Sequence, residues 1–170
     1  MDDGEVKAAA QLRSSAVGSV LDRMVRLLAR ICHVPIAVIT LDLSNQRCIL
    51  FTSNPNIKSS QDGKRLQMFD TWLSTVPLEP ELLIIQDTLL DARSRDSPWV
   101  TGEYGVEMRA YGGCPLVTSK GCRIGALQLA DWIPRKGSGT CAMLACNFAD
   151  IAVWEVENDR KLARQTEAGC

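Results

Sequence analysis

The sequence has 170 residues, of which 46% are hydrophobic and 23% charged, a globular composition that excludes a disordered or collagen-like chain. Nineteen basic side chains nearly balance twenty acidic ones, giving a formal net charge of −1, so we expect no surface for nucleic acid or anionic membranes. With no apolar run of the roughly 18 residues that a membrane span needs and no signal-peptide pattern, we expect a cytoplasmic protein without membrane insertion.

A long amphipathic helix is predicted first, over residues 5–31. Its apolar side chains recur at three- and four-residue steps, the spacing of one helix face: Val17, Val20, Leu21, Met24, Leu28 and Ile31. Pro35 ends this pattern, since the residue before a proline is pushed out of the helical region. His33 falls at this helix end, a position more typical of a capping residue than of a catalytic one.

Five strands are predicted from apolar or β-branched runs bounded by turn residues: 36–43, 48–51, 82–85, 109–118 and 124–131. A loop over 53–63 and a short helix around Phe69 separate the second strand from the third, and an irregular segment, 87–105, separates the third from the fourth. A final helix is predicted from Thr140 to about Leu162. This order predicts an α+β fold, an antiparallel sheet of five to six strands with the terminal helices on one face.

Several segments resemble, in their order and spacing, those of GAF domains, the small-molecule-sensing relatives of the PAS fold: 35–41, 85–87, 91–93, 97–102, 111–116 and 121–131. The resemblance covers residues 18–157, leaving 1–17 as an N-terminal helical extension and 158–170 as the C-terminal helix end and tail. It implies the strand order 2-1-5-4-3, with loops, a short helix and a pocket on the face away from the terminal helices. It also implies a non-catalytic regulatory domain in signal transduction. The single Cys-His pair, Cys32-His33, precedes the first strand, so the chromophore attachment of bilin-binding members is not expected.

The second hairpin sorts its side chains onto two faces, because alternate residues of a strand point to opposite sides. A two-residue turn at Lys120-Gly121 places Cys114 opposite Leu127. One face is small and apolar and suits helices: Ala110, Gly112, Cys114, Leu116, Leu127 and Leu129. The other face is partly polar: Arg109, Tyr111, Pro115, Ala126 and Gln128. Its polar side chains need partners if they are buried.

We predict that polar side chains of this face and of neighbouring segments surround a small-molecule ligand: Thr40, Asp87, Trp99, Arg109, Tyr111 and Gln128. A polar sheet face beside a long loop is a common arrangement of a lidded site. The alternative is that Arg109 pairs with Asp87 or Asp91 and that side chains of the protein fill the face. Each aspartate is also placed to cap the turn that follows it.

Catalysis and metal binding have little support in this sequence. It has one histidine, no metal-ligand spacing among its seven cysteines and no phosphate-binding glycine loop. We therefore predict no catalytic residue, no metal, no cofactor and reduced thiols throughout. A thiol-dependent methionine sulfoxide reductase, an activity found among GAF domains, stays as an alternative through Cys114 or Cys122. The hairpin register sets these two cysteines beyond disulfide reach.

Both terminal helices carry more apolar surface than one sheet contact requires. The predicted core stripe of the last helix consists of Cys141, Leu144, Ala145, Phe148, Ile151 and Ala152. Val153 and Trp154 fall outside this stripe, and Leu21 and Val25 mark the corresponding edge of the first helix. We predict a homodimer or a docking contact there, as the resemblance also implies, because GAF domains commonly pair through these helices. The alternatives are that Trp154 only covers neighbouring side chains, or that the chain is a structural subunit of a larger complex with a filled pocket.

Overall fold

The computed structural model describes residues 11–12, 14–43, 46–54, 82–103, 107–136 and 139–168, with the backbone alone at 42–43, 46–50, 142 and 160–168. Its elements follow in the order α2 (Ala16–Ile31), β1 (Ile36–Leu43), β2 (Gln46–Thr52), β3 (Leu83–Ile85), β4 (Ala110–Val117), β5 (Arg123–Asp131) and α4 (Gly139–Ala168). The short helix predicted around Phe69 lies outside the described residues. The domain boundaries at residues 17 and 157 stay predictions.

The strands form one five-stranded antiparallel sheet in the order β2-β1-β5-β4-β3, which confirms the predicted fold class and strand order. Cys114 lies opposite Leu127, as the hairpin register predicted. The turn itself is longer, because the pairing shifts after Leu116 and the Thr118 amide donates to the Cys122 carbonyl at 2.8 Å. Gly121 closes this turn with a φ of 77°, a left-handed conformation that glycine adopts without a steric cost.

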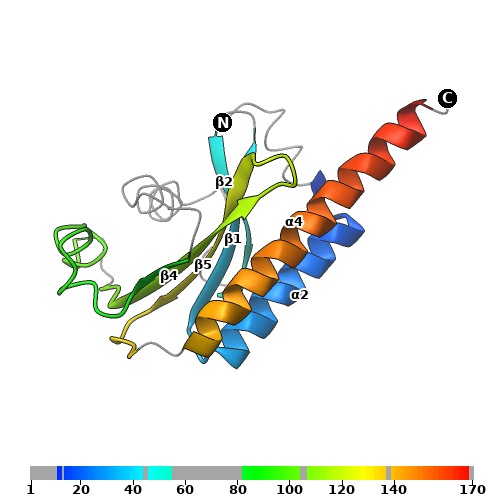
Figure 1. Ribbon diagram of the computed structural model, residues 1–170. Coiled ribbons are helices and arrows are strands. Elements are labelled where there is room, and N and C mark those ends of the chain that lie inside the picture. The colour runs from blue at the N-terminus through cyan, green and yellow to red at the C-terminus, as the bar shows by residue number, and fades with distance from the viewer. Residues whose placement is uncertain are drawn as a thin grey trace.

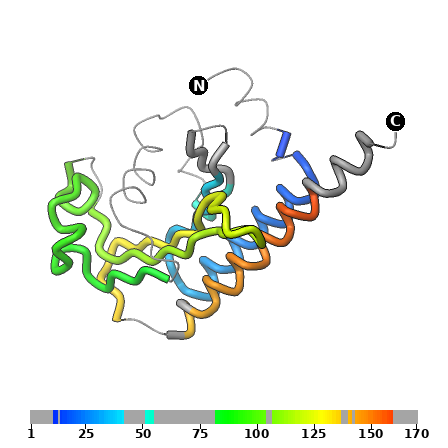
Figure 2. The backbone as a smooth tube through the Cα atoms, turned by 45° about the horizontal axis from the view of Figure 1, so that its top comes forward, coloured from blue at the N-terminus to red at the C-terminus, as the bar shows by residue number. Residues whose placement is uncertain are grey.

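The two long helices lie side by side against one face of the sheet, while the segment over 86–103 lies at the far end from the C-terminus of α4 (Figure 1). The tilted view in Figure 2 shows the same pairing of α2 with α4. The core between helices and sheet includes Leu21, Val25 and Leu28 from α2, Ala37, Ile39, Cys114, Leu116 and Leu127 from the strands, and Ala145, Ala149 and Ala152 from α4. The predicted helix-bearing face of the hairpin is thereby confirmed.

A serine cap starts α2, and a left-handed residue ends it. The Ser15 hydroxyl accepts a hydrogen bond from the Gly18 amide at 3.0 Å, so α2 begins at Ala16. Residues 11, 12 and 14 are also helical, so the described part of the predicted helix is interrupted at Ser15, and residues 5–10 lie outside the described part. At the other end His33 has a φ of 51°, and the Val34 amide bonds back to the Ala29 carbonyl at 3.0 Å. This is the geometry of a helix C-cap, so the predicted capping position of His33 is confirmed.

The helix α4 is longer than predicted, and its core face overlaps most of the predicted stripe: Ala145 and Ala152 lie in the core, and Cys141, Leu144 and Phe148 pack against it. Its 30 residues span roughly 45 Å, and its C-terminal part stands clear of the sheet (Figure 1). Its buried residues are Ala145, Ala149, Ala152, Val153 and Val156. Ile151, expected in the core stripe, is 48% exposed. The core-facing stripe is thus rotated toward small residues, because alanines let α4 pack closely on α2 and β4.

Candidate ligand-binding site

Three of the predicted ligand-binding side chains meet on the sheet face away from the helices. The Tyr111 hydroxyl on β4 donates to Gln128 Oε1 on β5 at 3.1 Å. Gln128 Nε2 donates to Thr40 Oγ1 on β1 at 3.3 Å, and Thr40 Oγ1 donates to the Ala126 carbonyl at 3.4 Å. All three side chains are buried. This chain of hydrogen bonds, the polar ladder Tyr111–Gln128–Thr40, pairs these side chains with one another.

Glycine in β4 makes the polar ladder possible. A Cβ at Gly113 would lie 2.9 Å from the Tyr111 hydroxyl oxygen, so the tyrosine ring reaches Gln128 by passing over a position without a side chain. Gly113 and Gln128 are register partners on neighbouring strands. The Gly-Gly pair of the sequence therefore serves close packing, the role that glycine often has inside a strand.

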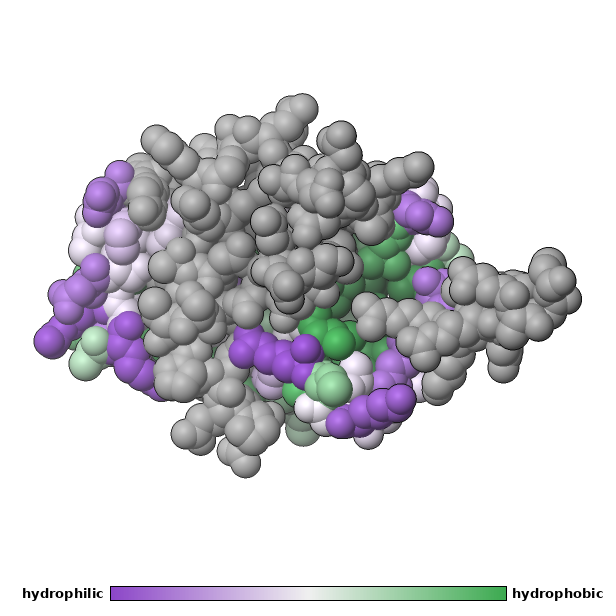
Figure 3. All heavy atoms as spheres, turned by 90° about the horizontal axis from the view of Figure 1, so that it is seen from above, coloured by the Kyte–Doolittle hydropathy of each residue, from purple (hydrophilic) through white to green (hydrophobic). Residues whose placement is uncertain are grey.

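Trp99 lies beside the ladder in a second hydrophobic core. This core consists of Ile36, Val38, Ile85, Trp99, Val100, Met108, Tyr111 and Ala130. The carbonyl of Trp99 accepts from the Met108 amide at 2.8 Å, and the Thr88 hydroxyl donates to the Met108 carbonyl at 2.5 Å. These bonds hold the segment that carries Trp99 closed over the sheet. Seen from above, hydrophobic side chains of the described residues form a patch right of the centre, and hydrophilic side chains border it on both sides (Figure 3).

Arg109 and Asp87 form an ion pair of their own. Both carboxylate oxygens of Asp87 accept from Arg109 Nη2, at 3.1 and 2.9 Å, and Oδ1 also accepts from the Leu89 amide at 3.1 Å. The hydrogen bonds from Arg109 hold the pKa of Asp87 below its ordinary value, against an opposing contribution from desolvation. The predicted alternative, in which Arg109 pairs with Asp87, is confirmed. So is the capping role of the aspartate.

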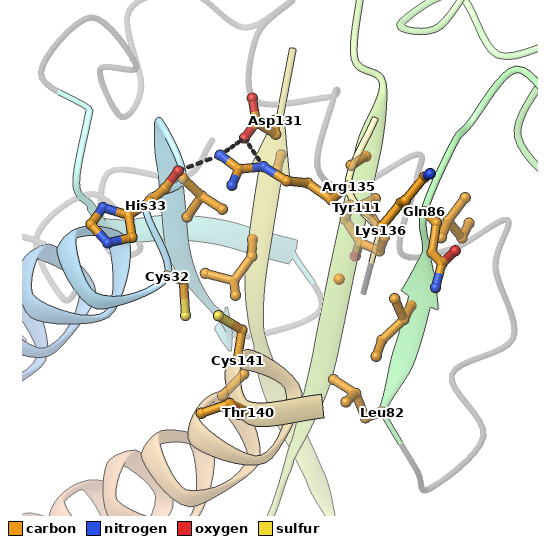
Figure 4. A pocket seen from close by; sticks show the side chains of 18 of the residues that line it. Cys32, His33, Leu82, Gln86, Tyr111, Asp131, Arg135, Lys136, Thr140 and Cys141 are labelled. Carbon is orange, nitrogen blue, oxygen red and sulfur yellow. Dashed lines mark hydrogen bonds and ion pairs between the residues drawn. The ribbon is translucent and has the colours of Figure 1, made fainter. Parts of the chain in front are cut away.

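A cavity of about 440 Å³ lies elsewhere, on the helix side of the sheet (Figure 4). Its walls come from the C-terminal end of α2, the first turns of α4 and the strands β3, β4 and β5. Most lining side chains are apolar, among them Ile31, Val34, Leu82, Ile84, Leu129 and Ala145. Tyr111 is the one predicted ligand-binding residue among the described lining residues. The sequence predicted a pocket on the other face, so this cavity was missed.

A charged clamp forms the rim of the cavity. Arg135 Nε donates to Asp131 Oδ2 at 2.6 Å, and Arg135 Nη2 donates to the carbonyl oxygen of His33, as Figure 4 shows. The backbone amide of Arg135 donates to the Gln86 carbonyl at 2.8 Å. The segment between β5 and α4 is thereby tied to the ends of α2 and β3. The sequence predicts only a linker here, and a four-residue spacing of Asp131 and Arg135 outside a helix gives no signal of the ion pair.

Two thiols face each other in the cavity wall. Cys32 caps α2 and Cys141 lies in the first turn of α4, with their sulfur atoms turned toward one another (Figure 4). Burial, with a hydrogen bond to Cys141, raises the pKa of the Cys32 thiol to about 12, so at neutral pH it is uncharged and a poor nucleophile. Among the described residues no group of three histidine, cysteine, aspartate or glutamate side chains is arranged to hold a metal ion.

The predicted interface residues separate into buried and exposed ones. Leu21 and Val25 are fully buried and Val153 is nearly so, so the expectation that they form surplus surface is wrong. These three side chains fill the space between α2, α4 and the sheet. Trp154 is 61% exposed and does lie on the surface. The other exposed large apolar residues of the two helices are Leu27, Ile31, Met143 and Ile151.

No family model matches the sequence. A cyclic di-GMP phosphodiesterase of Pseudomonas aeruginosa is 33% identical over 103 residues, which is 61% of this chain and 16% of that enzyme. The chain thus spans about a sixth of the length of this curated relative. Neither helix in the described part of the chain has the length and apolarity needed to cross a membrane.

Solved structures match most of the chain. A domain of a protein described as a two-component sensor histidine kinase from Sinorhizobium meliloti has a TM-score of 0.63 at 19% identity, covering 89% of this chain and 99% of that one. GAF3 from Slr1393 of Synechocystis, in its photoproduct state, has a TM-score of 0.66 at 13% identity, covering 88% of this chain and 98% of that one. The GAF domain from an Acinetobacter phosphoenolpyruvate-protein phosphotransferase has a TM-score of 0.59 at 16% identity, covering 96% of this chain and 99% of that one. At these identities the likeness establishes the fold.

Proposed function

We propose that this chain, which has the fold of GAF domains, is a non-catalytic regulatory domain that binds a small, mainly apolar molecule in the cavity beside its terminal helices. The observation that carries this proposal is the position of the cavity. Its walls include Cys32 and Val34 at the end of α2 and Cys141 and Ala145 at the start of α4. An occupant would therefore contact both terminal helices, and a molecule that favours one arrangement of the helices would shift the domain toward it.

The size and chemistry of the cavity fit such a ligand. Its volume of about 440 Å³ falls in the range of small-molecule sites, and apolar walls with a few polar groups at one end are usual there. The polar ladder fits less well, because its side chains already bond to one another. A ligand there would have to replace those hydrogen bonds. The ligand-binding role predicted for Thr40, Asp87, Trp99, Arg109, Tyr111 and Gln128 stays a prediction.

Filling the cavity tests this proposal. Gly112 lines the cavity, and a Cβ there would meet only the Leu83 carbonyl oxygen, at 3.7 Å. A Gly112→Leu side chain therefore has room at its base and projects into the space that the ligand would occupy. Gly112→Ala is the matched control, since one methyl group leaves most of the volume.

The measurement is native mass spectrometry of freshly isolated protein. We expect a retained small molecule on the parent protein and on Gly112→Ala, and the bare protein mass for Gly112→Leu at an unchanged thermal midpoint. A retained molecule that survives in Gly112→Leu would place the ligand elsewhere. Bare protein in all three would favour the alternative of a structural subunit with no ligand. Thiol-dependent turnover of methionine sulfoxide would instead support the reductase alternative.

We further propose that a second copy of the chain packs on the exposed apolar residues of the two helices. Met143, Ile151 and Trp154 share one side of α4 at helical spacing, and Leu27 and Ile31 are exposed on α2. Such a contact between helices of two copies would form a bundle. Trp154→Glu should then shift sedimentation toward the monomer without loss of helical content. A parent protein that sediments as a monomer at high concentration contradicts this contact.

We also propose that a domain of this kind works in the cytoplasm.

A further inference from the structure

Two thiols meet where α4 crosses β4. The Sγ atoms of Cys114 and Cys146 are 2.9 Å apart, with Cys114 in the middle of β4 and Cys146 in the second turn of α4. We propose that Cys114 and Cys146 form an oxidation site, at which a hydroperoxide converts the two thiols into a disulfide that joins α4 to the sheet. We predict reduced thiols in the resting protein, so the disulfide would form only when the oxidant is present.

The geometry of this pair is close to that of a disulfide. An S–S bond is about 2.05 Å long, so the two sulfur atoms need to approach by about 0.9 Å from their present separation. Both residues lie on regular elements, a strand and a helix, which hold the pair in place. Cys122, which the sequence sets beyond disulfide reach of Cys114, is exposed at the hairpin turn. The backbone amide of Cys122 donates a hydrogen bond to the Thr118 hydroxyl there, at 3.0 Å.

The reaction balances in two steps, the first of which releases water or an alcohol and the second water. The sulfur of Cys146 attacks the terminal oxygen of the hydroperoxide and the O–O bond breaks. Cys146 becomes a sulfenic acid, and the departing oxygen takes the thiol proton and leaves as water or an alcohol. The Cys114 thiol then attacks the sulfur of the sulfenic acid. The S–O bond breaks, the disulfide forms, and the thiol proton leaves with the hydroxyl group as water. Two thiols are oxidised by two electrons, and one hydroperoxide is reduced.

The order of the steps follows from burial. Cys146 is half-buried and can meet an oxidant, whereas Cys114 is only 2% exposed. Burial, together with the hydrogen bond between the two thiols, raises the pKa of the Cys114 thiol well above its ordinary value, so Cys114 is a poor first nucleophile. A sulfenic acid on Cys146, already in contact with Cys114, needs no further diffusion to react.

The disulfide would act on α4, the helix that borders the cavity. Ala145, the neighbour of Cys146, lines the cavity, and α4 continues from this crossing to residue 168. A covalent bond at Cys146 would hold the first turns of α4 against β4 and limit their displacement. Oxidation would thereby restrict the same helix that a ligand in the cavity contacts.

The test uses the full chain, treated in its folded state with hydrogen peroxide, freed of the oxidant, and then unfolded at neutral pH in the presence of a maleimide that alkylates the remaining thiols. We expect a mass lower by two hydrogen atoms and two fewer alkylated thiols than in the untreated protein. Trypsin releases Cys114 within 110–120 and Cys146 within 137–160, and cyanogen bromide cleavage after Met143 separates Cys146 from Cys141. The expected crosslink therefore joins 110–120 to 144–160.

Serine variants assign the residues. Cys146→Ser should abolish the crosslink, while Cys122→Ser should leave its yield unchanged. In Cys114→Ser the oxidation should stop at Cys146, where a cyclic 1,3-dione traps the sulfenic acid; this measurement does not depend on forming a disulfide. The crosslinked protein should also show slower amide exchange in the first turns of α4. A crosslink through Cys141 instead, or alkylation of both Cys114 and Cys146 after peroxide treatment, would overturn the proposal.

Discussion

Removing one hydroxyl group tests whether the polar ladder stabilises the fold. Tyr111→Phe keeps the aromatic ring in the second core and deletes only the donor that reaches Gln128 Oε1 at 3.1 Å. Gln128 is 0% exposed, so no water can replace the donor, and the amide oxygen is left unpaired. A buried polar atom that loses its partner costs about 1–3 kcal/mol. We therefore expect the free energy of unfolding to fall by about that amount.

The assay is chemical and thermal denaturation followed by circular dichroism. For a chain of this size each kcal/mol lowers the thermal midpoint by about 2–4 °C, so the expected shift is between about 2 and 12 °C. The double variant Tyr111→Phe/Gln128→Leu is the control, because removing both partners leaves no unpaired oxygen. It should lose less stability than the sum of the two single variants. A Tyr111→Phe protein as stable as the parent would refute the reasoning.

Three further variants test local features of the fold. Gly125→Ala should fail to accumulate as folded protein, since its Cβ would collide with the Thr40 carbonyl oxygen; a normal circular dichroism spectrum and melting curve would contradict this. His33→Gly should raise the free energy of unfolding in urea by about 0.5–1 kcal/mol by relieving a left-handed backbone, and an unchanged urea midpoint would argue against such relief. Asp87→Asn should be less stable than the parent at pH 7. Because Arg109 lowers the folded pKa of Asp87, its contribution is present above the unfolded pKa and is lost as the pH falls through the folded pKa, so the gap should close toward pH 2. A difference in stability between Asp87→Asn and the parent that stays the same at every pH would contradict the ion pair.

Local patterns were enough to predict the strands of the second hairpin and their two faces, whereas the strand order of the sheet came from the resemblance to GAF domains. Alternation along β4 and β5, with turn residues between them, places Cys114 opposite Leu127 and sends Tyr111 and Gln128 to the same face, because a strand has a side-chain period of two and a short turn sets the register. The α+β class and the helix end at His33 follow from equally local signals. The predicted two-residue turn was too short, because a one-residue bulge such as the one after Leu116 has no strong sequence signal.

Contacts between distant elements required the tertiary structure. A helix pattern indicates which side chains are apolar, but the packing of α4 against the sheet and α2 decides which of them become buried. Here Val153 is buried and Ile151 stays exposed. The cavity is the space left where two helix ends and a sheet edge fail to fill the volume between them, and no single segment encodes it. The Cys114–Cys146 contact joins residues 32 positions apart. Strand spacing can place a thiol on a face, but only the packing of α4 decides which other thiol it meets.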